Sequence, residues 1–338
     1  MTTSHAHTYI RQLTAATVPS MRYDGARPFK QWQDTAREKL RELLGLPLEK
    51  GGDTLNILSE SKTPAYTRMD FTYESEPGYL VPAVFLRPAS AAGRLPVVIC
   101  LQGHSTGMHI SLGEPQYEGD AQSIAGGRDF ALQAVREGYC AVVIEQRYMG
   151  VTGHGKNGKP SCQTDNESTA CLMLGRTAIG ERVWDVSRLI DILCLHFSDV
   201  IDSSRIACMG NSGGGTTTYY AACMDERIHL AMPSCSVCTY DDSIMAMHHC
   251  PCNFVPHIRR YFDMGDLGGL IAPRNLIVVC GQEDRIFPLP GVRECFARIH
   301  SLYEAHENAG QCLLVEGAGG HRFYPDETWP LARPILGK

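Results

Sequence analysis

One short stretch, residues 210–214 (GNSGG), restricts the fold of this chain more than any other feature. The apolar run RIACM precedes it and GTTTYYAA follows it, an order that predicts a strand, a sharp turn and a helix. A serine at the tip of such a turn has a strained backbone, and the residues two positions away must be small because strand and helix nearly touch. Gly210 and Gly214 meet that demand, so Ser212 is expected above the edge of a sheet.

The same turn suits a catalytic serine. The amide of Gly213 at the start of the helix can donate to a developing oxyanion. A phosphate-binding loop is the alternative, but the stretch lacks both the G-x-G-x-x-G spacing and the Gly-Lys-Ser/Thr ending that such loops use. Glycine-rich hexamers are common, so this stretch alone does not identify a catalytic serine. The acid and the base that a catalytic serine needs must be found elsewhere in the chain.

Composition narrows the class of protein. The chain has 338 residues, 43% of them hydrophobic, which suits one large domain with an extension. Its net charge of -6 offers no basic face, so we expect a small-molecule partner and neither nucleic acid nor a membrane. The first twenty residues lack the apolar core of a signal peptide, so a cytoplasmic protein is expected. Most of the fourteen cysteines lie in apolar runs, where reduced thiols behave as small hydrophobes.

The pattern after residue 96 predicts an α/β fold with a mostly parallel central sheet and helices on both faces, because short apolar runs alternate with helical periodicity. The expected strands are 97–101, 141–145, 206–209, 229–233, 276–280 and 312–316, and the expected helices are 121–137, 180–196, 213–224, 291–307 and 327–334.

Earlier in the chain, residues 29–44 show the apolar spacing of an amphipathic helix. Residues 66–73 and 79–87 have strand composition and are joined by EPG, a hairpin signal, so they should form the antiparallel edge of the sheet. The predicted organisation is an N-terminal helical extension (1–60) and a catalytic domain (61–338).

A serine nucleophile needs a general base, and the base needs an acceptor on its far nitrogen. The run GQED follows the strand at 276–280 and supplies Asp284, with Glu283 as the local alternative and a structural ion pair as the non-catalytic one. The run GAGGH follows the strand at 312–316 and places His321 beyond the next strand. The order serine, acid, histidine is that of the α/β-hydrolase triad.

The second oxyanion donor is expected in the loop LQGHSTG after the strand at 97–101. Backbone amides of Gly103 and His104 are the candidates, and which of them donates stays open. The alternative is that His104 only packs.

Residues 235–270 interrupt the alternation and are expected to form a lid-like insertion. Large side chains from it and from neighbouring loops should converge on one mouth and leave a narrow acyl pocket. These candidate substrate-binding residues are Met108, Tyr148, Tyr240, Phe254, Phe287 and Phe323. The cluster HHCPC at 248–252 contains residue types that bind metals. Its two cysteines are separated by one residue, however, which is closer than the Cys-x2-Cys spacing of zinc sites, so no metal is expected.

Arg147, at the end of a central strand, and Asp185, early on the next long helix, form a further predicted pair. A lone buried charge is costly, so the arginine needs a carboxylate partner. We interpret the pair as structural, with substrate contact as the alternative.

Taken together, these pieces resemble the α/β-hydrolase superfamily, in the acetyl xylan esterase-like or dienelactone hydrolase-like branch related to prolyl oligopeptidase catalytic domains. The matching motifs are QGH at 102–104, EQR at 145–147, GERVWD at 180–185, the 210–214 turn, IAPR at 271–274, Gly281 with Asp284, and GH at 320–321. The resemblance covers most of the chain and implies hydrolysis of carboxylic esters, often acetyl groups on carbohydrates, with no cofactor.

The leading hypothesis is therefore a serine esterase of small esters, in which Ser212, Asp284 and His321 form the triad. A serine peptidase or amidase is one alternative, although the propeller of prolyl oligopeptidases is absent. A catalytically inactive binding protein is the other. The sequence leaves a homo-oligomer open.

Overall fold

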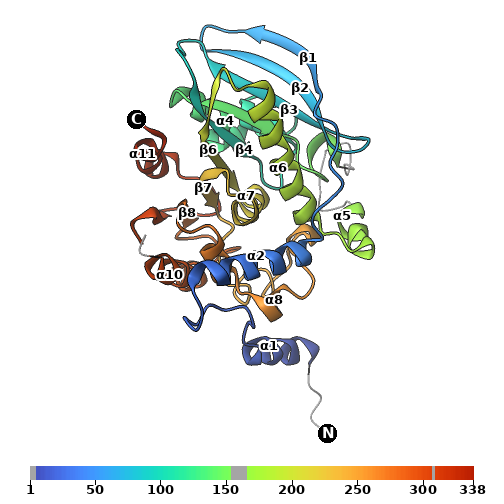
Figure 1. The fold of residues 1–338 in the computed structure, drawn as a ribbon, viewed down its shortest axis with the longest axis vertical. Coiled ribbons are helices and arrows are strands. Elements are labelled where there is room, and N and C mark those ends of the chain that lie inside the picture. The colour runs from blue at the N-terminus through green and yellow to red at the C-terminus, as the bar shows by residue number, and fades with distance from the viewer. Residues whose placement is uncertain (1–4, 154–165, 307–308) are drawn as a thin grey trace.

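A nine-stranded sheet organises the computed structural model, which describes residues 5–153, 166–306 and 309–338. The strand order is β1-β2-β3-β5-β4-β6-β7-β8-β9 (Figure 1). The strands are β1 (Leu55–Lys62), β2 (Tyr66–Glu76), β3 (Tyr79–Pro88), β4 (Leu95–Leu101), β5 (Cys140–Ile144), β6 (Ile201–Asn211), β7 (Ile228–Ser234), β8 (Asn275–Gly281) and β9 (Cys312–Gly317). Pairing is antiparallel from β1 to β3 and between β3 and β5, and parallel from β5 through β9.

Helices cover both faces of this sheet. They are α1 (Ala6–Ala16), α2 (Phe29–Leu44), α3 (Asp120–Ser123), α4 (Phe130–Arg136), α5 (Glu167–Ala170), α6 (Ala178–His196), α7 (Gly213–Met224), α8 (Ile258–Tyr261), α9 (Met264–Leu267), α10 (Leu289–Ala305) and α11 (Pro325–Leu336). Alternate residues of β4 belong to two separate cores: Val97 and Ile99 pack with α2, α6, α7 and α10, while Val98 packs with α4 and α11. The predicted α/β architecture is confirmed.

The N-terminal region differs from the prediction in one respect. The amphipathic helix at 29–44 is confirmed as α2, which buries Trp32 and Leu40 and ends at the left-handed Gly45. The region 1–60 is not only helical, however, because β1 begins at Leu55 and forms the outer edge of the sheet, beyond β2 and β3. After its first residue β1 is exposed throughout, so it has no apolar alternation by which to be predicted.

The predicted helix at 121–137 is broken. The chain forms α3, a π-helical turn over Ile124–Arg128, and then α4. Gly127 has a φ of 82° inside this turn, a conformation that a continuous helix cannot contain. The expected helix at 213–224 is confirmed as α7 with the same bounds, and the other expected helices correspond to α6, α10 and α11 with ends shifted by a few residues.

The insertion at 235–270 connects β7 to β8 through short helical turns that include α8, α9 and a 3₁₀ turn over Pro251–Asn253. Most of its apolar side chains are buried in the core shared with α7 and α10. Within the described residues, the model contains no helix that is both long and apolar enough to cross a bilayer.

Candidate active site

The predicted strand, turn and helix around Ser212 are confirmed as β6 and α7. Ser212 has φ 56° and ψ −123°, an unfavourable conformation for a residue with a side chain. Its amide donates to the carbonyl of Ser234 at 2.8 Å. A Cβ on Gly210 would lie 2.5 Å from the Gly214 backbone, so close packing of strand and helix requires glycine and raises the serine above the sheet.

Beyond β8 and β9, the structure brings together the predicted acid and base. His321 Nδ1 lies 2.8 Å from Asp284 Oδ2, which fixes the ring so that Nε2 is left for other contacts. Asp284 also accepts hydrogen bonds from the amides of Ile286 (2.8 Å) and Phe287 (3.2 Å). Burial alone would raise the pKa of Asp284, but His321 and the two amides hold it below its ordinary value. Glu283, the alternative acid, is exposed.

Ser212 and His321 line one cavity of about 220 Å³. The Phe287 ring lies nearly parallel to the His321 ring, with centroids 5.9 Å apart, and forms part of the same wall. The other lining residues are His104, Arg128, Gly213, His248, His249, Cys250, Asn253 and Ile286. None of the lining residues is a carboxylate, and Arg128 brings a permanent positive charge to the cavity.

Arg128, Asn253 and Ile286 line the cavity but were not predicted from the sequence, and Arg128 is the charged one among them. It sits at the end of the π-helical turn, and burial lowers its pKa. Among the described residues, its guanidinium forms no ion pair and no hydrogen bond. An arginine beside two glycines in a predicted surface helix gives no sequence signal of this position.

The loop after β4 lies close to Ser212, the predicted nucleophile. A Cβ on Gly103 would lie 2.5 Å from the Asn211 carbonyl and 3.0 Å from the Ser212 Cβ. Gln102 holds the loop from the other side by donating to Ser111 Oγ (2.6 Å) and to the Arg128 carbonyl (2.7 Å). The amides of Gly103 and His104 therefore stay the candidates for the second oxyanion donor, beside that of Gly213.

The remaining predicted substrate-binding residues lie outside this cavity. Tyr240 and Phe254 line a neighbouring pocket of about 230 Å³. Tyr148 hydrogen-bonds to Glu181 Oε2 at 2.5 Å, and Met108 packs on the core beside α4. Phe323 is fully buried edge-on against Phe130, so it supports the loop of His321 from below.

The predicted buried pair is formed. Arg147 donates from Nε and Nη2 to the two oxygens of Asp185, both at 2.8 Å, and its guanidinium lies 4.0 Å from the Tyr79 ring centroid. Neither residue lines the catalytic cavity. This geometry fits the structural interpretation.

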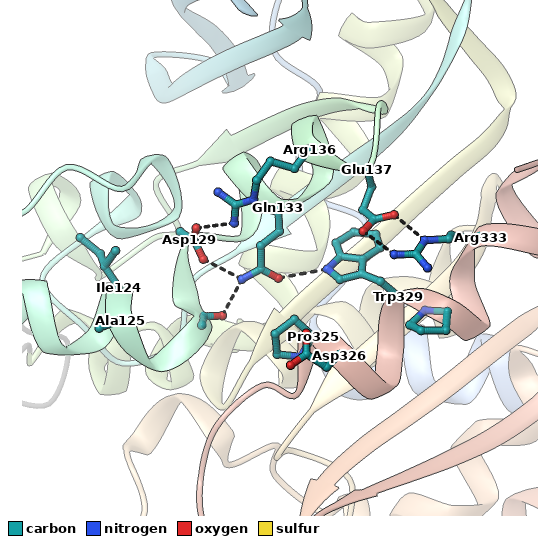
Figure 2. A pocket seen from close by; sticks show the side chains of 12 residues that line it. Ile124, Ala125, Asp129, Gln133, Arg136, Glu137, Pro325, Asp326, Trp329 and Arg333 are labelled. Atoms are coloured by element: carbon teal, nitrogen blue, oxygen red, sulfur yellow. Dashed lines mark hydrogen bonds and ion pairs between the residues drawn. The ribbon is translucent and has the colours of Figure 1, made fainter. Parts of the chain in front are cut away.

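A larger pocket, of about 600 Å³, lies between α4 and α11 (Figure 2). Figure 2 shows its polar side chains joined to one another: Gln133 accepts from Trp329 Nε1 at 3.0 Å, and Arg333 pairs with Glu137 at 2.7 Å. No serine, cysteine or histidine lines it, and two of its carboxylates, Asp129 and Glu137, are paired with Arg136 and Arg333.

Comparisons with known proteins agree with this architecture. The chain is 26% identical over 250 residues to "Putative hydrolase YtaP" of Bacillus subtilis (strain 168), a match that covers 71% of this chain and 77% of the relative. A "putative acetyl xylan esterase" of Bacteroides fragilis has a similar structure, with a TM-score of 0.81, 15% identity and coverage of 99% and 96% of the two chains. A glucuronoyl esterase from Solibacter usitatus aligns with a TM-score of 0.68, 16% identity and coverage of 95% and 97%.

The family assignment rests on a match to a family model that covers most of the chain. The model of the Abhydrolase family matches residues 6–308, from α1 to the approach to β9. That range includes the serine turn and Asp284 and leaves His321 just beyond it. The chain belongs to the Abhydrolase family.

Proposed function

We propose that this protein is a serine carboxylic-ester hydrolase that works through an acyl-enzyme. The observation that supports it best is the shared cavity: Ser212, on its strained turn, faces the same space as the His321 that Asp284 orients. A serine hydroxyl, an oriented imidazole and a buried carboxylate are the parts that acyl transfer requires.

In this mechanism Ser212 Oγ attacks the ester carbonyl while His321 Nε2 takes its proton. The backbone amide of Gly213, with one amide of the loop after β4, stabilises the negative oxygen of the tetrahedral intermediate. His321 then gives the proton to the leaving alcohol, and the acyl group stays on Ser212. Water repeats the steps in reverse and releases the carboxylic acid.

The substrate class follows from the size of the cavity and from similar structures. A space of about 220 Å³, walled by Phe287 and histidines, suits a short acyl group such as acetyl. The similar structures, a putative acetyl xylan esterase and a glucuronoyl esterase, favour esters of carbohydrates. Small esters taken up into the cytoplasm are the preferred substrates.

The test compares aryl acetates with aryl octanoates. The specificity constant should fall from acetyl to octanoyl, because an extra methylene gains only about 0.8 kcal/mol on burial and overpacking costs typically about 1–3 kcal/mol. Ser212→Ala should lose roughly 10⁴-fold or more in kcat. Ser236→Ala, which removes a buried hydroxyl that makes no hydrogen bond among the described residues, is the matched control.

Two results would redirect the proposal. A specificity constant that rises with chain length would indicate a lipase-like enzyme. Faster hydrolysis of the matched anilide than of the ester would favour the peptidase or amidase alternative.

A further inference from the structure

Three potential metal ligands from distant parts of the chain meet beside the catalytic cavity. His104, in the loop after β4, places Nε2 3.1 Å from the Sγ of Cys252, which is 148 residues further along. The Sγ of Cys252 lies 3.2 Å from that of Cys250. The donor atoms of all three residues lie within 4.8 Å of one another, and both cysteines are buried.

We propose that His104, Cys250 and Cys252 bind a zinc ion. The short Cys-x-Cys spacing argued against a metal in the sequence, but the fold brings a third potential ligand, His104, to the two cysteines from a distant loop. Thiolate and imidazole donors favour zinc, whereas calcium and magnesium take oxygen ligands.

The spacing of the donors fits this ion. Zn–S bonds of about 2.3 Å and Zn–N bonds of about 2.0–2.1 Å place tetrahedral neighbours about 3.6–3.8 Å apart. The observed pairs, at 3.1 and 3.2 Å, would need to open by about 0.5 Å to admit the metal. Three protein donors leave one tetrahedral position for a further ligand.

A second group of potential metal ligands, Cys235, Asp284 and His321, belongs to the proposed catalytic site. Cys235, Asp284 and His321 also lie close together, but the Asp284–His321 hydrogen bond already assigns two of them to the triad. Cys235 Sγ donates to the Arg322 carbonyl at 3.3 Å. This second cluster is therefore part of the catalytic apparatus.

The position of the proposed site gives it a role. The His104 ring lies against the start of α7, where a Cβ on Gly213 would be 2.8 Å from its Cε1. Gly103, the preceding residue, touches Ser212. Zinc at this point would fasten the oxyanion loop to the 235–270 insertion, so His104, Cys250 and Cys252 act as positioning residues and the metal takes no part in bond making.

Metal content of the full-length protein is the first test, and it does not depend on the proposed esterase activity. After exposure to zinc and exhaustive dialysis, elemental analysis should find roughly one zinc per chain, and less than about a tenth of that in Cys250→Ser and Cys252→Ser. Cys238→Ser, a buried cysteine of the same insertion outside the cluster, should keep the metal. Zinc absent from the wild type, or retained in both cluster variants, overturns the proposal.

Cobalt substitution of the wild-type protein guards against variants that fail to fold. Co²⁺ should give thiolate-to-cobalt absorption in the near ultraviolet and tetrahedral visible bands, and zinc should displace them. A spectrum without thiolate bands would contradict the site. A chelator should also lower the Tm of the wild type reversibly and leave the Tm of Cys252→Ser unchanged, and equal Tm losses in both proteins would contradict it too.

Discussion

Two carboxylates follow strands of the same sheet, are equally buried, and differ in charge. Asp284, beyond β8, is 4% exposed, and Glu145, directly after β5, is 3% exposed. The pKa of Asp284 is lowered, whereas burial raises the pKa of Glu145 to about 8. Asp284 contacts the His321 ring and two amides, while Glu145, among the described residues, accepts from the amides of Met108 (3.2 Å) and Val151 (3.4 Å) and from no charged side chain. The partner of a buried carboxyl therefore decides its charge.

This difference separates the proposed catalytic carboxylate, Asp284, from a structural one, Glu145. The charged Asp284 can orient His321 and stabilise the imidazolium that forms during the reaction. Glu145 is neutral below about pH 8 and ties the loop after β4 to the loop after β5. A Cβ on Gly150 would lie 2.1 Å from Glu145, which shows how tightly the second loop packs on this carboxyl.

The largest expected effect on kcat comes from neutralising Asp284, the carboxylate that pairs with His321. Asp284→Asn should keep the fold and lower kcat roughly 10⁴-fold, because the amide favours the wrong tautomer of His321. Steady-state kinetics on an aryl acetate measures this loss. Glu283→Gln, at the exposed neighbouring position, is the control, and the reverse order of the two effects would move the acid by one residue.

A third buried carboxylate, Asp185, shows what a charged partner contributes to stability, because burial raises its pKa and the Arg147 guanidinium opposes that rise. Asp185→Asn removes the bidentate partner of Arg147, which keeps its ion pair with Glu76 (2.5 Å), so the loss should lie at the low end of the about 3–5 kcal/mol typical of a broken buried pair. Urea unfolding monitored by circular dichroism measures the change. Asp199→Asn, on the exposed surface, should stay within about 0.5 kcal/mol of the wild type. Equal values for the two variants would show that the Arg147 pair contributes nothing measurable.

Glu145→Gln should stabilise the protein in a pH-dependent way. The folded pKa of about 8 exceeds the ordinary value of 4.5, so the folded state binds more protons and the wild type loses stability as the pH rises between these values. Each unit of that shift corresponds to about 1.4 kcal/mol. The Tm advantage of the variant should therefore be small at pH 5 and largest above pH 8. An advantage independent of pH would show that Glu145 does not titrate in this window.

Arg128 is the inverse case, a cation with no carboxylate partner among the described residues, and its effect should be the smallest. Arg128 can pair with a carboxylate on the acyl group of a substrate, such as that of a succinate monoester. Arg128→Met should then raise KM for this ester by roughly tenfold or less, because a partly exposed ion pair contributes little binding energy. The KM for the matched neutral acetate should not change. Equal changes for both esters would assign Arg128 a purely structural role.

Sequence could predict the parts of this molecule that follow from local rules. The turn at Ser212 was predictable because close packing leaves only glycine at positions 210 and 214. The parallel strands were predictable because each contains a short, nearly continuous apolar run that is buried in the core. The strand β1 has an exposed surface with no such pattern. The contact between His104 and Cys252 could not be predicted, because the two loops meet only in the folded chain. The position of Arg128 in the cavity could not be predicted for the same reason.

The central claim is that Ser212 is an activated nucleophile, and covalent labelling measures this most directly. A fluorophosphonate should add one phosphonyl group to the wild-type protein, seen as a single mass increase, and peptide mapping should place it on Ser212. Labelling should be lost in Ser212→Ala and much slower in Asp284→Asn. A wild-type protein that stays unlabelled, or a label found on another residue and retained in Ser212→Ala, would contradict the account.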